Sequence, residues 1–411
     1  MGGKAALMLV LGFSLIFMVA GKNFNEMATG TVQNFSDYYR DAKAHHLTAS
    51  GVNLVTNKIF LNNSTGDQIF NYNFGEPKDE GTITVILRTI DPSQNIKELI
   101  SIGKYKGTTA RTRILLKPGS FSEYAYFSNS EGEDIWWTTR DTVWGPMHTN
   151  WQLRVADRPV FMGRVTIDGR LVKFSNRANP QFLGGFKTGV NIPMPSNGVS
   201  KVSNAAASTA KFIGKNLVYL EFRGDSIRYK FSSSGPYTYV LASTFAPNGV
   251  IFAENAELRI KGNVKGKYTI GASGTGGNRG KIFLDDDVTY NTDPRVNPAS
   301  QDLLGIVAER DVVITQNSAN NNDIRIDASI YTQNGSFTAE NYQGRPVSGA
   351  IYLYGGITQN ARGPVGTFRS GSTTVIESGF SKRYRYDGRL AIASPPAYPG
   401  TDSFKIISWF E

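Results

Sequence analysis

The sequence predicts an α+β fold that is mostly β: a long N-terminal helix, then an antiparallel β layer, then an irregular β-helix or solenoid-like head. Three observations predict this order. Residues Ala5–Gly21 carry no charge and continue, without a proline, into a polar stretch that keeps helical spacing. From residue 67 the apolar period changes to two. From about residue 143 the chain becomes short β pieces separated by Gly, Asn or Asp.

The first predicted element is a stem helix over residues 4–62, after a short leader of residues 1–3. As a helix, Ala5–Gly21 would rise about 26 Å, which is near the lower limit for crossing a bilayer core. An ordinary secretory signal would instead end at a small-residue cleavage site. Beyond Gly21, apolar positions recur every three or four residues and form one predicted stripe: Val32, Phe35, Tyr39, Ala42, His46, Ala49, Val52, Thr56 and Ile59.

Residues 63–142 predict an antiparallel β layer that rests on the upper half of the stem. Hydrophobic and polar side chains alternate in each segment, which is typical of a sheet with one buried face. The predicted strands are Gln68–Phe74, Gly81–Ile90, Leu99–Tyr105, Thr109–Leu116 and Phe121–Phe127.

Residues 143–411 predict the head. Pieces such as Glu257–Ile260 and Asp311–Thr315 each offer two alternating apolar side chains, and coil-by-coil stacking would bury them as one inner ladder. No fixed repeat length holds, so a jelly roll or a sandwich remains an alternative. An insertion at about residues 200–245 predicts a short helix over Ala205–Lys215, followed by a hairpin of Leu217–Phe222 and Ser226–Phe231.

Composition excludes some kinds of chemistry. The chain of 411 residues has no cysteine, so disulfides and thiolate chemistry are absent. It has three histidines and no HExxH pair, which argues against a His-rich metal site. The net charge is +10, but the basic residues are scattered and the densest cluster is Ser381–Tyr386. A soluble surface is the ordinary interpretation; DNA uptake and adhesion to an acidic surface are the alternatives.

Acidic residues provide the candidate metal and catalytic groups. Weak Ca²⁺ candidates are Asp285, Asp286 and Asp287, with Asp293 and Asp302 after them, since carboxylate oxygens are the ligands that Ca²⁺ prefers. The spacings of an EF-hand and of the nonapeptide calcium repeat are both missing, so a solvated turn is the preferred interpretation.

Asp323, Arg325 and Asp327 alternate along a predicted strand and could share the face of a polysaccharide-active cleft. An exposed strand of mixed charge is the ordinary explanation. His148 is predicted to hydrogen-bond the backbone at a turn. We therefore predict no catalytic residue, no cofactor and no firm metal site, and expect the protein not to be an enzyme.

Met1-Gly2-Gly3-Lys4 stands directly before an apolar helix. This start resembles the short leader of type IV prepilins, and the resemblance implies cleavage by a prepilin peptidase after Gly2 or Gly3. Tyr38–Asn53 resembles the stem of PilX-type minor pilins. The remainder is similar to large pilin-like exported proteins with an uncharacterised, strand-rich head, through Gly145–Asn150, Pro159–Gly163, Tyr384–Leu390, Pro395–Pro399 and Ser408–Trp409.

One position departs from the major pilins, which carry a Glu at the fifth mature residue. Here that residue is Leu7 or Met8, depending on the cut. Certain minor pilins and pseudopilins also lack this Glu, so the resemblance to them is closer. An unpaired N-terminal amine is unfavourable inside a filament, and a tip or priming position relieves that cost.

The resemblance implies a structural subunit of a type IV pilus-like filament or of its assembly or tip complex. The chain would enter the inner membrane, meet the prepilin peptidase and pilus assembly machinery, and then pack with itself or other pilins at the cell surface. The head would mediate adhesion to an unknown ligand or contacts between subunits. The alternative is a membrane-anchored extracytoplasmic β-helix adhesin or polysaccharide-active enzyme. The stem residues expected in the membrane or filament are Ala5, Leu7, Met8, Leu11, Leu15, Phe17 and Val19.

Overall fold

The computed structural model describes residues 2–61, 66–74, 81–92, 95–369 and 375–411. These residues form two compact units. The stem unit comprises Met1–Lys117 with Phe404–Glu411, and the head unit comprises Pro118–Ser403. Each unit has its own buried core, so each is described by itself.

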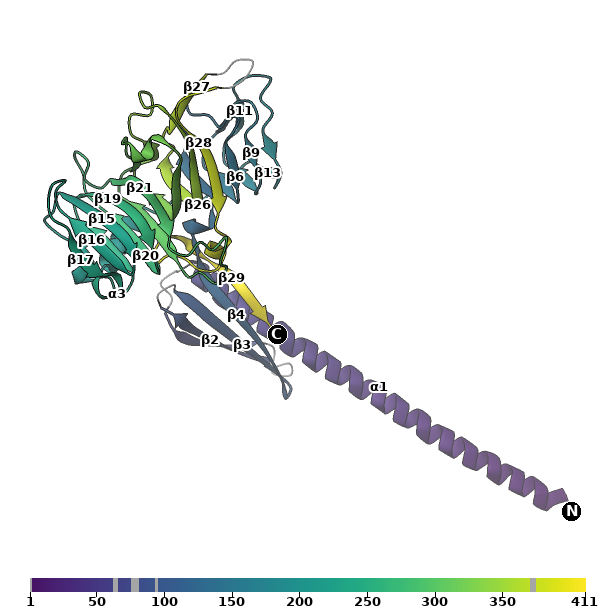
Figure 1. Cartoon of the computed structure of the whole chain (residues 1–411). Helices are drawn as coiled ribbons and strands as arrows, with labels where there is room; N and C mark the ends of the chain where they lie inside the picture. The colour runs from purple at the N-terminus through teal and green to yellow at the C-terminus, as the bar shows by residue number, and fades with distance from the viewer. Residues whose placement is uncertain (1, 62–65, 75–80, 93–94, 370–374) are drawn as a thin grey trace. The chain divides into compact units, whose positions relative to one another are not determined.

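Helix α1, Gly2–Leu61, confirms the predicted stem helix. It is one uninterrupted helix of 60 residues, and its N-terminal part has no strand of the stem unit beside it (Figure 1). At 1.5 Å per residue its length is about 90 Å. Gly12, Gly21 and Gly30 lie in this free part with open space around them, and they do not interrupt the helix.

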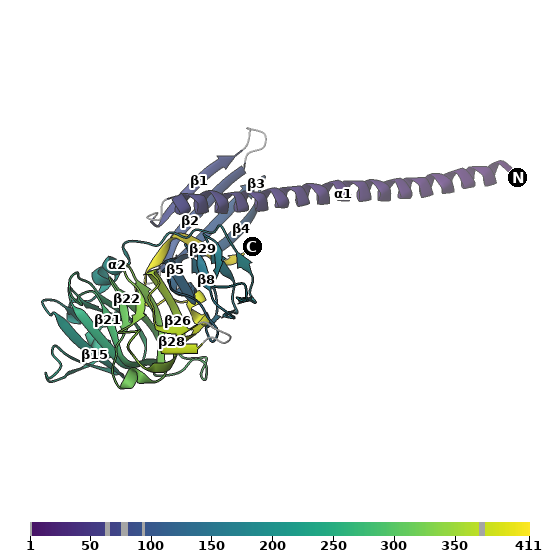
Figure 2. The ribbon, with the colours of Figure 1, turned by 90° about the horizontal axis from the view of Figure 1, so that it is seen from above.

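The β layer of the stem unit has the strand order β1-β2-β3-β4-β29. Strands β1 to β4 pair antiparallel with their neighbours, as predicted from the period of two. They lie along the C-terminal part of α1 (Figure 2). Strand β29, the last in the chain, adjoins β4. The alternation of apolar and polar residues in this strand does not indicate which sheet it joins. The bounds are β1 Gln68–Phe74, β2 Gly81–Asp91, β3 Ile96–Tyr105, β4 Thr108–Ser120 and β29 Gly400–Phe410.

The buried face of α1 differs from the predicted stripe. Of the nine predicted positions, only Val52 and Ile59 are fully buried, whereas Val32 and Phe35 are each 69% exposed. The reason is close packing: a Cβ on Gly103 of β3 would lie 2.5 Å from the Ala44 carbonyl oxygen. The small side chains of α1 therefore turn toward the sheet, and the buried positions are Ala44, Thr48, Gly51, Val52, Val55 and Ile59.

The head unit contains two runs of short strands. The first run comprises β5 Tyr126–Ser130, β6 Thr142–Trp144, β7 Met147–Thr149, β8 Leu153–Val155, β9 Val160–Phe161, β10 Val165–Ile167, β11 Leu171–Lys173, β12 Gln181–Phe182 and β13 Phe186–Lys187. The second run comprises β14 Lys211–Phe212, β15 Leu217–Gly224, β16 Ser226–Lys230, β17 Thr238–Leu241, β18 Val250–Ala253, β19 Glu257–Val264, β20 Lys267–Ala272, β21 Ile282–Tyr290, β22 Leu303–Ala308, β23 Val312–Ile314, β24 Ile324–Thr332, β25 Phe337–Ala339, β26 Val347–Ala361, β27 Gly366–Arg369 and β28 Val375–Tyr386.

Most of these strands pair in parallel with a strand that lies one coil further along the chain. In the second run β18, β20, β22, β24 and β26 follow one another in this way, and β15, β19 and β21 form a neighbouring ladder (Figure 1). Because the pairing is parallel, side chains of the same kind stack on one another in successive strands. One inner row, buried throughout, is Val218, Leu258, Ile282, Val312 and Phe337.

The two runs join out of sequence order. In the first run β5, β7, β10 and β13 form one parallel ladder, and β6, β9 and β12 form another. Strand β26 pairs with β5, and β28 pairs with β6. The end of the second run therefore lies against the start of the first, and we call this place the junction.

Two local predictions were wrong. Phe121–Phe127 is not a strand of the antiparallel layer: Phe121–Glu123 forms a 3₁₀ turn closed by a Ser120–Glu123 capping box, and β5 begins at Tyr126 in the head unit. The helix expected over Ala205–Lys215 lies earlier, as α2 Gly198–Ala205, because Val199 and Val202 supply the buried face. A second short helix, α3, spans Ala242–Phe245.

The predicted hairpin is confirmed. Strands β15 and β16 pair antiparallel, and Gly224 adopts a φ of +65° at the turn, a conformation that glycine accommodates without strain. Strand β15 also pairs in parallel with β19, so the hairpin extends the ladder rather than standing apart from it.

Candidate functional site

Two buried ion pairs lie at the junction. Arg362 Nη1 is 2.7 Å from Glu131 Oε2, and Lys382 Nζ is 2.8 Å from Asp141 Oδ2. Both cations also lie over the ring of Trp137, at 4.3 Å for Arg362 and 5.5 Å for Lys382. These five residues, which we call the junction cluster, connect segments more than 200 residues apart in the chain.

Additional hydrogen bonds satisfy the carboxylates of the junction cluster. Glu131 Oε1 accepts from the hydroxyls of Tyr126 and Ser128, each at 2.6 Å. Asp141 accepts from the backbone N–H of Thr138 at 2.9 Å and of Lys382 at 3.1 Å. Burial in an apolar setting is costly for a charge unless such bonds surround it. The same burial lowers the pKa of the Lys382 amine and raises the pKa of Tyr126 well above its usual value.

A pocket of about 520 Å³ opens beside the Asp141–Lys382 pair. The segment before β6 contributes Trp136 and Thr138, and the β27–β28 hairpin contributes Phe368 and Lys382. Its volume falls in the range of pockets that bind small molecules. Within the described residues it thus combines aromatic side chains with a buried ion pair.

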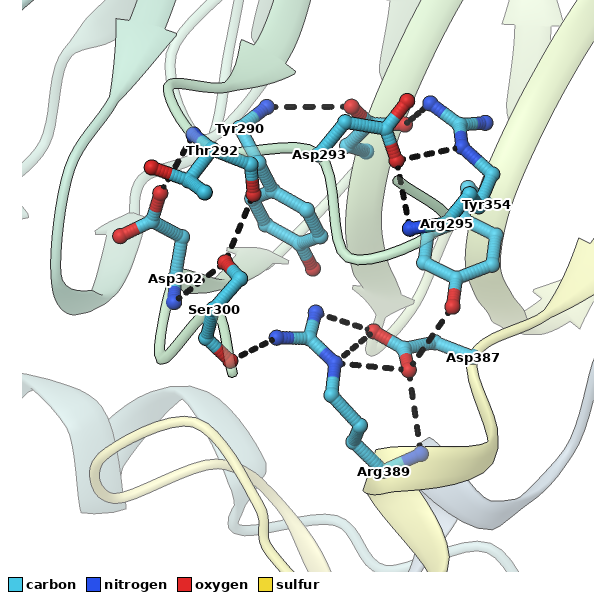
Figure 3. A network of polar contacts seen from close by, with 10 residues as sticks. Tyr290, Thr292, Asp293, Arg295, Ser300, Asp302, Tyr354, Asp387 and Arg389 are labelled. Atoms are coloured by element: carbon cyan, nitrogen blue, oxygen red, sulfur yellow. Dashed lines mark hydrogen bonds and ion pairs between the residues drawn. The ribbon is translucent and has the colours of Figure 1, made fainter. Parts of the chain in front are cut away.

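A second polar network lies where the segment after β21 meets the chain after β28 (Figure 3). Asp387 is fully buried and forms an ion pair with Arg389 at 2.6 Å, while the Tyr354 hydroxyl donates to it at 3.3 Å. Arg389 also donates to the Ser300 carbonyl at 2.9 Å. Burial, and then the negative charge of Asp387, raises the pKa of Tyr354 to about 12.

Asp327 belongs to the same network, and it is 2% exposed. It accepts from the Tyr290 backbone N–H at 3.0 Å, and Arg295 Nη2 lies 3.4 Å away. Arg295 in turn forms a closer ion pair with Asp293 at 2.7 Å. Burial raises the pKa of Asp327 to about 6, despite the opposing Tyr290 hydrogen bond and Arg295 charge.

The three weak Ca²⁺ candidates do not converge on one point. Asp285 is occupied by an ion pair with Arg259 at 2.5 Å. Asp286 accepts from the Asp287 N–H, and Asp287 accepts from the Arg325 N–H, each at 2.8 Å. Across the residues that the structure describes, no three His, Cys, Asp or Glu side chains are grouped to hold a metal ion.

The structure does not bring Asp323, Arg325 and Asp327 into a shared cleft. Asp323 is exposed and accepts from the Ala350 N–H at 2.8 Å, whereas Asp327 is buried in the network described above. Arg325 is exposed between them.

The predicted turn role of His148 was wrong. His148 lies on β7, fully buried, with its ring nitrogens 2.7 Å from the side-chain oxygens of Thr166 and Asn150. Burial lowers the pKa of its imidazole, which favours the neutral ring. Its contacts are those of a structural residue in the ladder.

Comparisons with known proteins give a limited result. A family model described as a domain of unknown function (DUF4900) matches residues 94–169, which is less than half of the chain. The crystal structure of the competence-associated pilin ComZ from Thermus thermophilus is similar at 12% identity, with a TM-score of 0.35. That comparison covers 90% of this chain and 97% of the ComZ chain. No curated protein matches the sequence.

Proposed function

We propose that the protein is a structural subunit of a type IV pilus-like filament or of its assembly or tip complex. The observation that carries this proposal is the exposed apolar part of α1. Leu7, Met8 and Phe17 are 67%, 76% and 72% exposed, and the other large apolar side chains in Ala5–Gly21 are 54–70% exposed. In the part of the chain that the structure describes, α1 is the one helix long and apolar enough to cross a membrane.

An apolar helix of this kind needs a partner that excludes water. Burying one Val, Leu, Ile, Phe or Met side chain is worth about 1.5–3 kcal/mol, so the eleven such residues in Ala5–Gly21 strongly favour lipid or other helices over water. Lipid tails and a bundle of stems are similarly apolar, which makes transfer from membrane to filament feasible. Neither Leu7 nor Met8 is a Glu that could pair with an N-terminal amine, so that amine would be buried unpaired inside a filament. A tip or priming position avoids burying it, and we therefore favour that position.

The head unit is proposed to be an irregular β-solenoid that faces solvent and mediates adhesion or contacts between subunits. The support is its parallel ladder, in which each coil buries one row of side chains against the next. The polar turns between strands, which vary in length, remain free to form a binding surface.

The test is incorporation into filaments. Shearing surface filaments from cells and identifying their subunits by mass spectrometry should find this chain, with a mature N-terminus at Gly3 or Lys4. Leu15→Lys places a charge in the apolar segment, where it costs about 2.5–3.5 kcal/mol at the centre of a membrane helix, and should abolish incorporation. Val32→Lys is the matched control, since Val32 is also exposed on α1 but lies C-terminal to the apolar segment.

Two results would contradict the proposal. One is a chain that keeps Met1, stays in the membrane and is absent from filaments, which would favour an anchored adhesin or enzyme. The other is normal incorporation of Leu15→Lys, which would mean that the apolar segment is not what packs.

A further inference from the structure

The pocket beside the junction cluster is lined by a cation whose hydrogen-bonding capacity the protein uses only in part. Thr138 also lines the pocket, but its hydroxyl oxygen is fully enclosed by the protein, so a ligand does not reach it. Across the described residues the Lys382 ammonium has one hydrogen-bond acceptor, Asp141 Oδ2, although it carries three N–H donors. Buried donors are normally satisfied, so the donor capacity of Lys382 beyond Asp141 and the Trp137 ring marks where a ligand would accept a hydrogen bond.

Aromatic side chains form the other part of the lining. Trp136 and Phe368 both line the pocket, and both pack on Phe174. The ring centroids of Trp136 and Phe174 are 5.0 Å apart at 88°, an edge-to-face contact that fixes the orientation of the tryptophan. Tyr342 adds a further ring to the lining. A ligand with an apolar face can therefore pack on rigid rings.

The charge of the pocket disfavours anions. Asp141 neutralises Lys382, and Asp134 at the rim adds an exposed carboxylate. A phosphate or a uronic acid would meet this excess of negative charge and would have to compete with Asp141 for Lys382. An uncharged ligand that both donates and accepts hydrogen bonds meets no such barrier.

We propose that this pocket binds one or two units of a neutral saccharide. A pyranose ring has a face of C–H groups, which packs on the Trp136 ring, and an edge of hydroxyls. Those hydroxyls would accept from Lys382 and donate to Asp134. The inference rests on the proposed adhesive role of the head and gives it a ligand class and a location.

The test measures binding of neutral sugars to the full-length protein in a detergent without a sugar headgroup. The probes are methyl glucoside, methyl galactoside, N-acetylglucosamine and their disaccharides, followed by saturation-transfer NMR. At least one probe should bind the unmodified protein. Trp136→Ala should weaken that binding about tenfold through loss of one aromatic contact. Asp134→Ala, an exposed change that leaves the buried lining intact, should weaken it several-fold.

Trp151→Ala is the matched control, because Trp151 is 46% exposed and does not line the pocket. It should bind as tightly as the unmodified protein. The inference is overturned if no neutral sugar binds, if Trp136→Ala and Asp134→Ala both bind normally, or if inorganic phosphate or glucuronate binds in preference. The unmodified protein separates the two proposals: incorporation into filaments without binding of any neutral sugar refutes only the pocket, whereas sugar binding by a chain that is absent from filaments refutes only the filament role.

Discussion

Replacing Asp327 by Asn should remove most of one pH-dependent contribution to the stability of the head unit. Burial raises the pKa of Asp327 to about 6 in the folded protein, from 3.8 for the free side chain. The folded state therefore binds this proton more tightly than the unfolded state does. The associated stability is fully present below pH 3.8 and is lost as the pH rises through 6.

The size of the effect follows from the difference between the two pKa values. That difference is about two units, and each unit corresponds to about 1.4 kcal/mol, so the contribution lost between pH 4 and pH 7 is about 3 kcal/mol. Asn keeps the acceptor for the Tyr290 N–H and has no charge to bury, and Arg295 retains Asp293 as its closer partner. At pH 7 the variant should therefore be more stable than the unmodified protein by up to the same amount.

Urea unfolding of the detergent-solubilised chain, followed by tryptophan fluorescence at several pH values, measures this difference. Four of the five tryptophans, at positions 136, 137, 144 and 151, lie in the head unit, so the signal reports mainly on that unit. Asp323→Asn is the control: Asp323 directly precedes β24, the strand of Asp327, but is exposed, so this variant removes no buried charge and should not gain stability at pH 7. Parallel pH profiles for Asp327→Asn and the unmodified protein would refute the argument.

Two further substitutions test the packing. Glu131→Gln leaves Arg362 buried without its counter-charge and should lower the free energy of unfolding in urea by about 3–5 kcal/mol. The double variant with Arg362→Met should recover most of that loss. A single variant as stable as the unmodified protein would contradict a paired, buried charge. Gly103→Val should destabilise the stem unit by about 1–3 kcal/mol or more, because the new Cβ would lie 2.5 Å from the Ala44 carbonyl. Hydrogen exchange of β2 and β3 measures this, and Gly30→Ala, which meets open space, should leave it unchanged.

Local patterns predicted the elements of the stem unit well. The helix follows from an uncharged segment that runs into helical spacing without a proline, and strands β1 to β4 follow from a period of two. Which face of α1 is buried could not be predicted, because it depends on the close approach that Gly103 of β3 allows. A stripe chosen for its large side chains overlooked that small ones, such as Ala44, allow the closest approach.

The polar clusters of the head were largely missed. The sequence shows Trp137 as one of two adjacent tryptophans, but Glu131 and Arg362 are 231 residues apart, and nothing local connects them. Among the acidic residues singled out in the sequence, Asp293 and Asp327 do meet in the second network, where both pair with Arg295. Asp285 and Asp323 instead form separate contacts. Pairing between distant segments depends on the order in which coils stack, and a single sequence with no fixed repeat does not contain that order.

The junction explains why charges are buried in an otherwise apolar stack. The inner rows of a parallel ladder are nearly interchangeable, so apolar burial alone does not determine which coil β28 and β26 pair with. The Glu131–Arg362 and Asp141–Lys382 pairs are satisfied only when β6 and β5 occupy those places, and any other register leaves four buried charges unpaired. If this specificity is their role, replacing all four by apolar residues should preserve stability but allow alternative joins. Loss of hydrogen-exchange protection confined to β5 and β6 would reveal those joins, and unchanged protection there would mean that the strand ends alone select the partner.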